Sequence, residues 1–253
     1  MSNLITEVVV YNIESALNAQ NGGADRVELC DNPGGGGTTP SSGTIEMLRE
    51  ELEIGLFVMV RPREGDFCYS DLEFEAMKSD IRRAKQLNAD GVVLGILTPE
   101  GTIDRKRNKE LIDLARPLQV TCHRAFDMTR DPAEALEDCV AAGFDRILTS
   151  GQQAQAKDGI DLIARLVKAA EDRIKIMAGC GVDEDTVEEI VERTGVHEIH
   201  FAAEGSRSSL MQYQNSQITG MGTTTGREYK VTIADDSRVA ETRRRALQIY
   251  ERS

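Results

Sequence analysis

Residues suited to acid–base chemistry stand at the ends of short β-branched stretches of this sequence. Glu28 falls within the stretch 26–29, and His123 follows the stretch 118–122, with Asp127 four residues further on. A positioned carboxylate or imidazole can move a proton to or from a reacting group. We therefore take Glu28, His123 and Asp127 as candidate catalytic residues.

Arginines and glycines at other stretch ends have the chemistry to hold an anion. Two arginines follow the stretch 54–60, and a third follows the candidate histidine. A guanidinium group binds a carboxylate or a phosphate through two parallel hydrogen bonds. Two glycines after the stretch 174–177 precede a predicted helix, where backbone N–H groups can face a phosphate. The candidate anion-binding residues are Arg61, Arg63, Arg124, Gly179 and Gly181.

Metal binding is the third chemistry that the residue types allow, because thiolates favour Cu(I) or zinc. Four of the five cysteines lie in or just after predicted strands, at positions 30, 68, 122 and 180. Cys122 alternates with His123, so these two side chains should point to opposite faces, and Cys139 falls in a predicted helix. Packing as a small apolar side chain is the competing interpretation for a buried cysteine. The candidate metal ligands are Cys30, His123 and His200, whereas His197 is expected at the opposite rim.

The elements that must position these residues alternate along the chain. Short β-branched stretches predict strands at 6–10, 26–29, 54–60, 91–94, 118–122, 146–148, 174–177 and 198–201. Amphipathic stretches between them predict helices at 13–20, 42–52, 71–87, 105–115, 132–142, 157–171, 183–193 and 238–250. Each helix returns the chain to the start of the next strand, so the sheet is expected to be parallel. Eight such units predict a closed (β/α)8 TIM barrel, formed by residues 1–253 as a single α/β domain.

An open doubly wound sheet is the alternative fold. Such a sheet usually carries a glycine-rich phosphate loop after its first strand, but here that strand ends Val10-Tyr11-Asn12. In a barrel the carboxyl ends of all strands meet at one opening, where active sites are built. The sequence therefore predicts that Glu28 and Arg61 converge with the two strand-end histidines around one mouth. A buried ion-pair network that closes the barrel top is the competing interpretation of the same residues.

The composition disfavours several classes of partner. The chain has 253 residues and a net charge of −13, which repels nucleic acids and anionic membranes. The nearest basic patch, 243–245, lies in a predicted helix rich in compensating charge and is interpreted as a solvated face. No apolar run approaches the ~20 residues of a membrane span, and the N-terminus does not resemble a signal peptide. An odd number of cysteines without a CxxC pair suits a reducing compartment, so a cytoplasmic location is expected.

The segment 202–237 interrupts the alternation between the last predicted strand and the last predicted helix. It is rich in Ser, Thr, Gly and Gln. A connection of this length is usually a lid, an interaction arm or a disordered region, and the composition does not separate these alternatives.

The sequence resembles the CutC family, whose members are named copper homeostasis proteins. The matching phrases run in order along most of the chain, at 25–30, 36–41, 61–70, 123–127, 148–151 and 177–182. The resemblance implies a (β/α)8 barrel, a cytoplasmic location, a homodimer and Cu(I) binding linked to copper tolerance. The family's cysteine at the end of the second strand is present as Cys30. Cys122 and Cys180 stand where the family commonly has a phenylalanine and a small residue, so a shared copper site would depend on Cys30.

Three functions follow as hypotheses. The first is a cytosolic copper homeostasis protein that binds Cu(I). The second is an enzyme that acts on a small anionic or phosphorylated metabolite by acid–base chemistry. The third is a non-catalytic interaction scaffold that uses the segment 202–237 as an arm.

Overall fold

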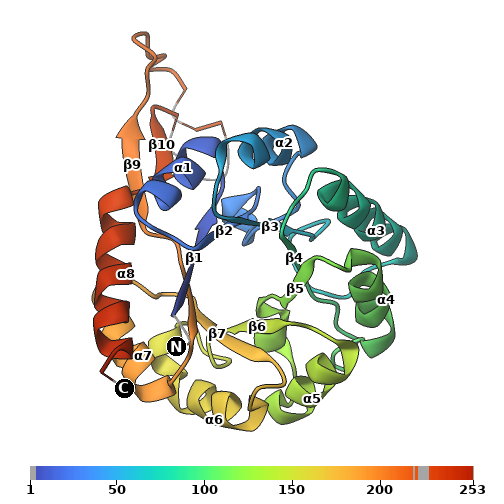
Figure 1. Ribbon diagram of the computed structural model, residues 1–253. Helices are drawn as coiled ribbons and strands as arrows, with labels where there is room; N and C mark the ends of the chain where they lie inside the picture. The colour runs from blue at the N-terminus through green and yellow to red at the C-terminus, as the bar shows by residue number, and fades with distance from the viewer. Residues whose placement is uncertain (1–3, 219, 222–227, 253) are drawn as a thin grey trace.

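The centre of the protein is a closed barrel of eight parallel strands that are neighbours in chain order. The computed structural model describes residues 4–218, 220–221 and 228–252. Figure 1 looks into the barrel and shows the helices as a ring outside the strands. The predicted (β/α)8 fold is confirmed. The strands are β1 (Ile5–Val10), β2 (Arg26–Leu29), β3 (Gly55–Met59), β4 (Gly91–Leu94), β5 (Gln119–Cys122), β6 (Arg146–Thr149), β7 (Lys175–Gly179) and β8 (Glu198–Phe201).

The helices follow the predicted pattern, with two differences at their ends. They are α1 (Ile13–Asn21), α2 (Ser42–Glu51), α3 (Asp71–Gln86), α4 (Arg105–Ala115), α5 (Pro132–Ala142), α6 (Ile160–Ala170), α7 (Val187–Thr194) and α8 (Asp236–Tyr250). The stretch predicted as one helix at 157–171 is divided into a short 3-10 turn, η3 (Ala156–Asp158), and α6. The helix predicted from Asp183 begins later because the Asp183 carboxylate accepts the backbone N–H groups of 185 and 186 in a turn.

Three aspartates occupy equivalent positions in similar five-residue segments of the sequence, at 23–27, 88–92 and 143–147. Asp25, Asp90 and Asp145 each stand just before a strand and accept a backbone N–H from the preceding strand. The distances are 2.8 Å to Thr6, 2.8 Å to Leu56 and 2.6 Å to Val120. Each carboxylate therefore accepts a hydrogen bond from a backbone N–H near the start of a strand, where the parallel ladder leaves that N–H unpaired.

Alternation along β1 decides which side chains reach the barrel interior. Val8 and Val10 are fully buried in the core between strands and helices. The residues of opposite parity, Val9 and Tyr11, line a cavity at the barrel mouth. Glu7 has the same parity as these two and is completely buried. A carboxylate at the centre of a barrel requires charged partners, because an isolated buried charge is strongly unfavourable.

The segment 202–237 contains a β-hairpin. Strand β9 (Glu204–Ser208) pairs antiparallel with β10 (Lys230–Ala234). Side chains of α1 and the residue before it hold this hairpin, because Asn12 and Asn18 donate to backbone carbonyls of β10 at 2.9 Å. Figure 1 shows it projecting beyond the ring of helices next to α1 rather than across the barrel centre. Among the three predicted alternatives, this placement favours an arm.

Two further expectations concern partners. Within the described residues, no helix combines the length and the apolar character needed to cross a membrane. The basic stretch of α8 is paired: Arg244 and Arg245 both bind Glu241 at 2.7 Å, and Arg243 lies 3.7 Å from Asp25. This pairing agrees with the interpretation of a solvated, charge-compensated helix face.

Candidate functional site

A cavity of about 440 Å³ opens at the carboxyl ends of the strands. The four residues expected to converge there do so: Glu28, Arg61, His123 and His200 all line it, and Arg124 joins them. The remaining wall is largely apolar and includes Val9, Met59, Phe67, Leu148, Val182 and Phe201. Asp183 and Glu204 lie on the side of β7 and β9.

Arg61 is a buried cation that no carboxylate neutralises. The residue is 5% exposed, and its guanidinium donates to three backbone carbonyls, those of Gly35, Gly37 and Gly65, at 2.8–2.9 Å. None of the ion pairs between described residues involves Arg61, and its Nε has no hydrogen-bond partner among them. The guanidinium carbon lies 5.0 Å from the centre of the Phe67 ring. The side chain is thus held in place while its charge stays available to an anion.

His123 is a neutral hydrogen-bond donor. Its Nδ1 accepts the backbone N–H of Ala125 at 3.2 Å, so the single proton of the neutral ring resides on Nε2. That Nε2 is buried and has no partner among the described residues. Burial, followed by the charge of Arg61, lowers the pKa of His123 to about 3. At neutral pH this imidazole therefore carries no charge and presents one N–H.

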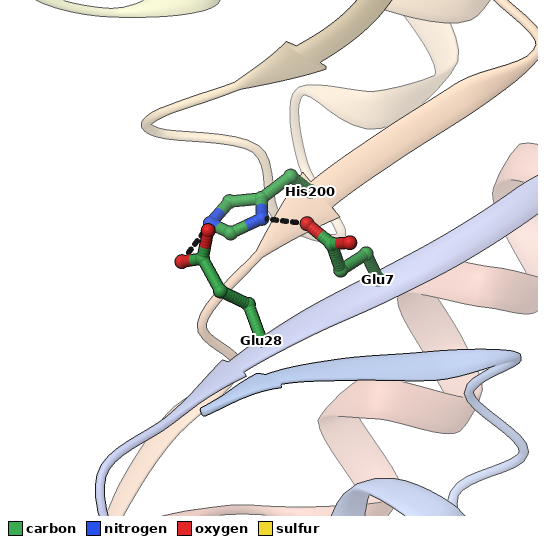
Figure 2. Close-up of side chains that lie close together, drawn as sticks. All are labelled: Glu7, Glu28 and His200. Carbon is green, nitrogen blue, oxygen red and sulfur yellow. Dashed lines mark hydrogen bonds and ion pairs between the residues drawn. The ribbon is translucent and has the colours of Figure 1, made fainter. Parts of the chain in front are cut away.

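Glu28 and His200 form the proton-holding part of the site, shown in Figure 2. Glu7 Oε1 fixes His200 through Nδ1 at 2.7 Å, and His200 Nε2 lies 3.9 Å from Glu28 Oε2. Burial raises the pKa of Glu28 to about 7, although His200 opposes the shift. Burial disfavours the charged imidazole, but Glu28 and Glu7 outweigh it and raise the pKa of His200. Glu28 can therefore gain or lose a proton near neutral pH.

An ion-pair network lies deeper in the barrel, below the mouth. The strand register places Glu7 beside Arg26 on one side and His200 on the other. Glu7 binds Arg26 at 2.5 Å, Arg26 also binds Glu198, and Arg146 binds Glu198 at 2.9 Å. Burial disfavours the Glu7 carboxylate, but Arg26 and His200 outweigh it and hold its pKa at about 2. The competing interpretation of a buried network is thus realised in part: His200 joins the network through Glu7, whereas Arg61 is not part of it.

Sequence reasoning missed Glu7, which anchors both His200 and Arg26. A signal for it was present, because Glu7 is the one charged residue inside the β-branched stretch at 5–10. A charge within a strand that is buried on both faces must have a partner. The barrel fold predicts functional residues at strand ends, whereas Glu7 lies in the middle of its strand.

Several predicted site residues lie outside the cavity wall. Arg63 binds Glu73 at 2.6 Å and Asp66 at 3.0 Å, so its charge is compensated. Asp127 accepts from Arg124 at 2.8 Å and from the backbone N–H of Ser150 at 3.0 Å, which orders the loop after β6.

Of the two glycines predicted to bind a phosphate, one lines the cavity and the other does not. Gly181 lines the cavity, but its neighbour on that wall is the acidic Asp183. Gly179 does not line it, and an added Cβ there would lie 2.5 Å from Leu148 and 3.1 Å from His200. Gly179 therefore permits close packing of β7 against His200.

The cysteines also divide into two groups. Cys30 donates to Glu28 Oε2 at 3.5 Å, and burial, followed by Glu28, raises the pKa of its thiol well above the usual range. Cys180 lines the cavity and donates to the carbonyl of Ala154 at 3.1 Å. Cys122 and Cys139 are buried in the layer between strands and helices, as predicted from the parity of Cys122 and from the helical position of Cys139.

The third histidine lies at the opposite rim, as expected. His197 Nδ1 lies 2.5 Å from the Tyr250 hydroxyl of α8, and the two rings meet edge to face. The contact joins the start of β8 to the last helix, so this histidine has a structural role.

Comparison with known proteins gives consistent similarities. The CutC family model matches residues 4–205. A human protein named copper homeostasis protein cutC homolog is 45% identical over 93% of this chain and 86% of its own length. A CutC protein of Bacteroides fragilis is 48% identical over 96% of this chain and 97% of its own length. The crystal structure of CutC from Streptococcus agalactiae, 38% identical, superposes with a TM-score of 0.75 and covers 78% of this chain and 98% of that one.

Proposed function

This chain belongs to the CutC family, and given that membership we propose that its barrel mouth binds a small anionic metabolite and acts on it by acid–base chemistry. The observation that carries this proposal is the buried Arg61 guanidinium without a carboxylate partner. Removing an ion from water costs several kcal/mol unless opposite charge compensates it. An anion bound in the cavity would provide that compensation, whereas a purely structural arginine would be paired, as Arg26 and Arg146 are.

Each residue of the wall has a role in this proposal. Arg61 holds the anionic group, and His123 donates its Nε2–H to a substrate oxygen. Glu28 exchanges a proton with the substrate, and His200, oriented by Glu7, places its charge 3.9 Å from the Glu28 carboxylate and stabilises it. The anion is assigned to Arg61 because the other two arginines of the wall, Arg124 and Arg238, are paired with Asp127 and Glu184. Asp127 supports the site through Arg124 rather than by contact with substrate.

Arg61→Met is expected to weaken the binding of small anions by about tenfold to a hundredfold, since a hydrogen bond to a charged group contributes about 1.5–3 kcal/mol. The measurement is calorimetric titration of the full chain with pyruvate and with inorganic phosphate. Arg63→Met is the matched control, because Arg63 follows the same strand but is paired with Glu73 and Asp66. Arg61→Lys, which retains the charge, should bind with intermediate affinity. Equal losses in the Arg61 and Arg63 variants would contradict the assignment.

Cu(I) binding is a second candidate, and one arrangement supports it. The Cys30 thiol and His200 Nε2 both lie near Glu28 Oε2, at 3.5 and 3.9 Å. Mammalian relatives carry a copper homeostasis name. Copper binding is the second candidate for two reasons. Cys30 is the one thiol of this arrangement, and its raised pKa disfavours the thiolate, which is the form that binds copper. His123, the third candidate ligand, has its Nδ1 engaged with Ala125.

Copper binding has a direct test. Reduced protein titrated with Cu(I) against a competing chelator should lose affinity by more than about tenfold in Cys30→Ser, because a soft ligand is replaced by a hard one. Cys68→Ser, which removes a half-buried thiol outside the cavity, should bind as the unmodified chain does. Binding that is indifferent to Cys30→Ser would reject this site.

We further propose a cytoplasmic location and a homodimer. The five cysteines are all free, which suits a reducing compartment. Exposed apolar side chains gather where the hairpin projects, and exposed patches of this kind commonly mark contacts with other chains. They are Leu210, Met211, Tyr213 and Met221. A scaffold function would use the same arm.

A further inference from the structure

On the wall of the cavity at the barrel mouth, both a hydrogen-bond acceptor and a hydrogen-bond donor lack partners. Glu28 Oε1 is a buried acceptor without a partner, and His123 Nε2 is a buried donor without one, within the described part of the chain. The Arg61 guanidinium, whose Nε side faces the buried Tyr69 hydroxyl, adds an uncompensated positive charge. The side chains of Glu28, His123 and Arg61 all line the mouth. A buried polar atom without a partner is costly, so such a group calls for an explanation. A substrate that loses a proton at the acceptor and gains negative charge at the His123 donor would satisfy both atoms, and its anionic group would compensate the charge of Arg61.

His123 is built as a donor and not as a base. Its accepting nitrogen, Nδ1, already binds the Ala125 N–H, which leaves only Nε2–H for a ligand. A fixed N–H in a site closed to water stabilises charge that develops on a carbonyl oxygen. A neutral imidazole opposite a carboxylate base is a known arrangement for removing a proton next to a carbonyl group.

The rest of the wall favours proton transfer over nucleophilic attack. Apolar side chains of Val9, Met59, Phe67 and Leu148 form much of the wall. Among the described residues that line the cavity there is no serine, threonine or lysine, and the thiol of Cys180 is engaged with the Ala154 carbonyl. Glu28 is then the residue that acts on the substrate, and a carboxylate next to a carbonyl-binding donor acts as a base.

We infer that this mouth removes a proton from a carbon next to a carbonyl group, in a small substrate that also carries a carboxylate or a phosphate. The inference rests on the proposed function and specifies its reaction. The Glu28 carboxylate takes the proton as the C–H bond breaks, and the electron pair of that bond forms a C=C bond. The carbonyl π pair moves onto oxygen, where His123 Nε2–H holds it. Return of the proton restores the carboxylate, so no oxidant, reductant or co-reactant is consumed.

The proton on Glu28 can exchange with water that enters the cavity, because Glu28 and the neighbouring His200 both line it. His200 Nε2 lies 3.9 Å from Glu28 Oε2, and Glu7 holds the ring in that orientation. His200 is 8% exposed and lines the cavity, so it can exchange protons with water. A substrate carbon that is deprotonated here should therefore acquire deuterium from D2O.

The test uses the full chain with pyruvate and dihydroxyacetone phosphate in D2O, followed by proton NMR. Loss of the substrate C–H signals is expected to be faster than in protein-free buffer. Glu28→Gln should slow it by about 10²–10⁴-fold, the usual contribution of a general base. His123→Leu should slow it by about 10²–10³-fold, while His123→Gln, which keeps an N–H near the Nε2 position, should retain a larger part of the rate. The exposed-pair variant Glu134→Gln is the control and should exchange at the unmodified rate.

The outcomes separate the reaction class from the binding function. Exchange of pyruvate alone identifies a carboxylate substrate, and exchange of dihydroxyacetone phosphate alone identifies a phosphate. Binding of either probe at the mouth, seen as a shift of the His123 Nε2–H signal, without exchange above buffer overturns the reaction class and leaves the proposed function intact. If neither probe binds and neither undergoes exchange, both the reaction class and the proposed function are overturned. Exchange that Glu28→Gln leaves unchanged also overturns the inference.

Discussion

Glu7→Gln is expected to lower the free energy of unfolding by about 3–5 kcal/mol at neutral pH, the usual cost of breaking a buried ion pair. Glu7 is completely buried and binds both Arg26 and His200, so a neutral amide leaves a buried guanidinium with less compensation. Urea unfolding of the full chain, followed by circular dichroism, measures the difference. Glu134→Gln, which removes one partner of the exposed pair with Arg130, should cost less than about 1 kcal/mol.

The pH dependence of this difference has a definite sign. The pKa of Glu7 is about 2 in the folded protein, below its ordinary value of 4.5. Its contribution to stability is therefore fully present above pH 4.5 and is lost as the pH falls toward 2. The unmodified chain and the Glu7→Gln variant should converge in stability in acid. A variant within about 1 kcal/mol of the unmodified chain at neutral pH would mean that the network does not depend on Glu7.

The rate of solvent exchange at the substrate carbon should rise about tenfold per pH unit below pH 7 and then level off. The pKa of Glu28 is about 7 because burial disfavours its carboxylate. Only the carboxylate can accept a proton, so activity increases as Glu28 ionises. The pKa of His123, about 3, is too low to add a step between about pH 5 and pH 8. Exchange rates measured across this range give the profile.

Two variants test whether the inflection of this pH profile belongs to Glu28. Glu28→Gln should give a slow rate that does not change with pH, because no carboxylate remains. His200→Gln should move the inflection upward, since the charge of His200 now lowers the pKa of Glu28. An inflection near 4.5, the ordinary pKa of a glutamate, would show that Glu28 is not desolvated at the mouth and would reject it as the base.

The barrel could be predicted from the sequence because its signal is repeated. Eight β-branched stretches separated by amphipathic ones leave few topologies, and caps such as Asp131 before Pro132 mark where helices begin. The hairpin gave no such signal. Its first strand, Glu204–Ser208, has no alternation of apolar residues, and its partner strand, Lys230–Ala234, stands far along the chain. Pairing of this kind depends on the three-dimensional neighbours, here α1.

The site could be predicted in part, for a related reason. The position of a side chain at a strand end follows from the fold, which is why Glu28, Arg61, His123 and His200 converge as predicted. The partners of a side chain do not follow from the fold. Arg61 and Arg63 are equivalent in sequence terms, but only the latter reaches Glu73 on α3 and is neutralised. Which arginine retains an unpaired charge is a property of the packed structure.

The most direct test of the account is the state of the His123 imidazole at the mouth, since the site is defined by a neutral donor beside an unpaired cation. Nitrogen-15 NMR of the full chain observes both ring nitrogens with and without pyruvate or phosphate. We expect a neutral ring from about pH 5 to pH 8, with its proton on Nε2 and an Nε2–H signal that shifts when the anion binds. A ring that titrates near its ordinary pKa of 6.5, or a signal indifferent to saturating anion, would contradict it.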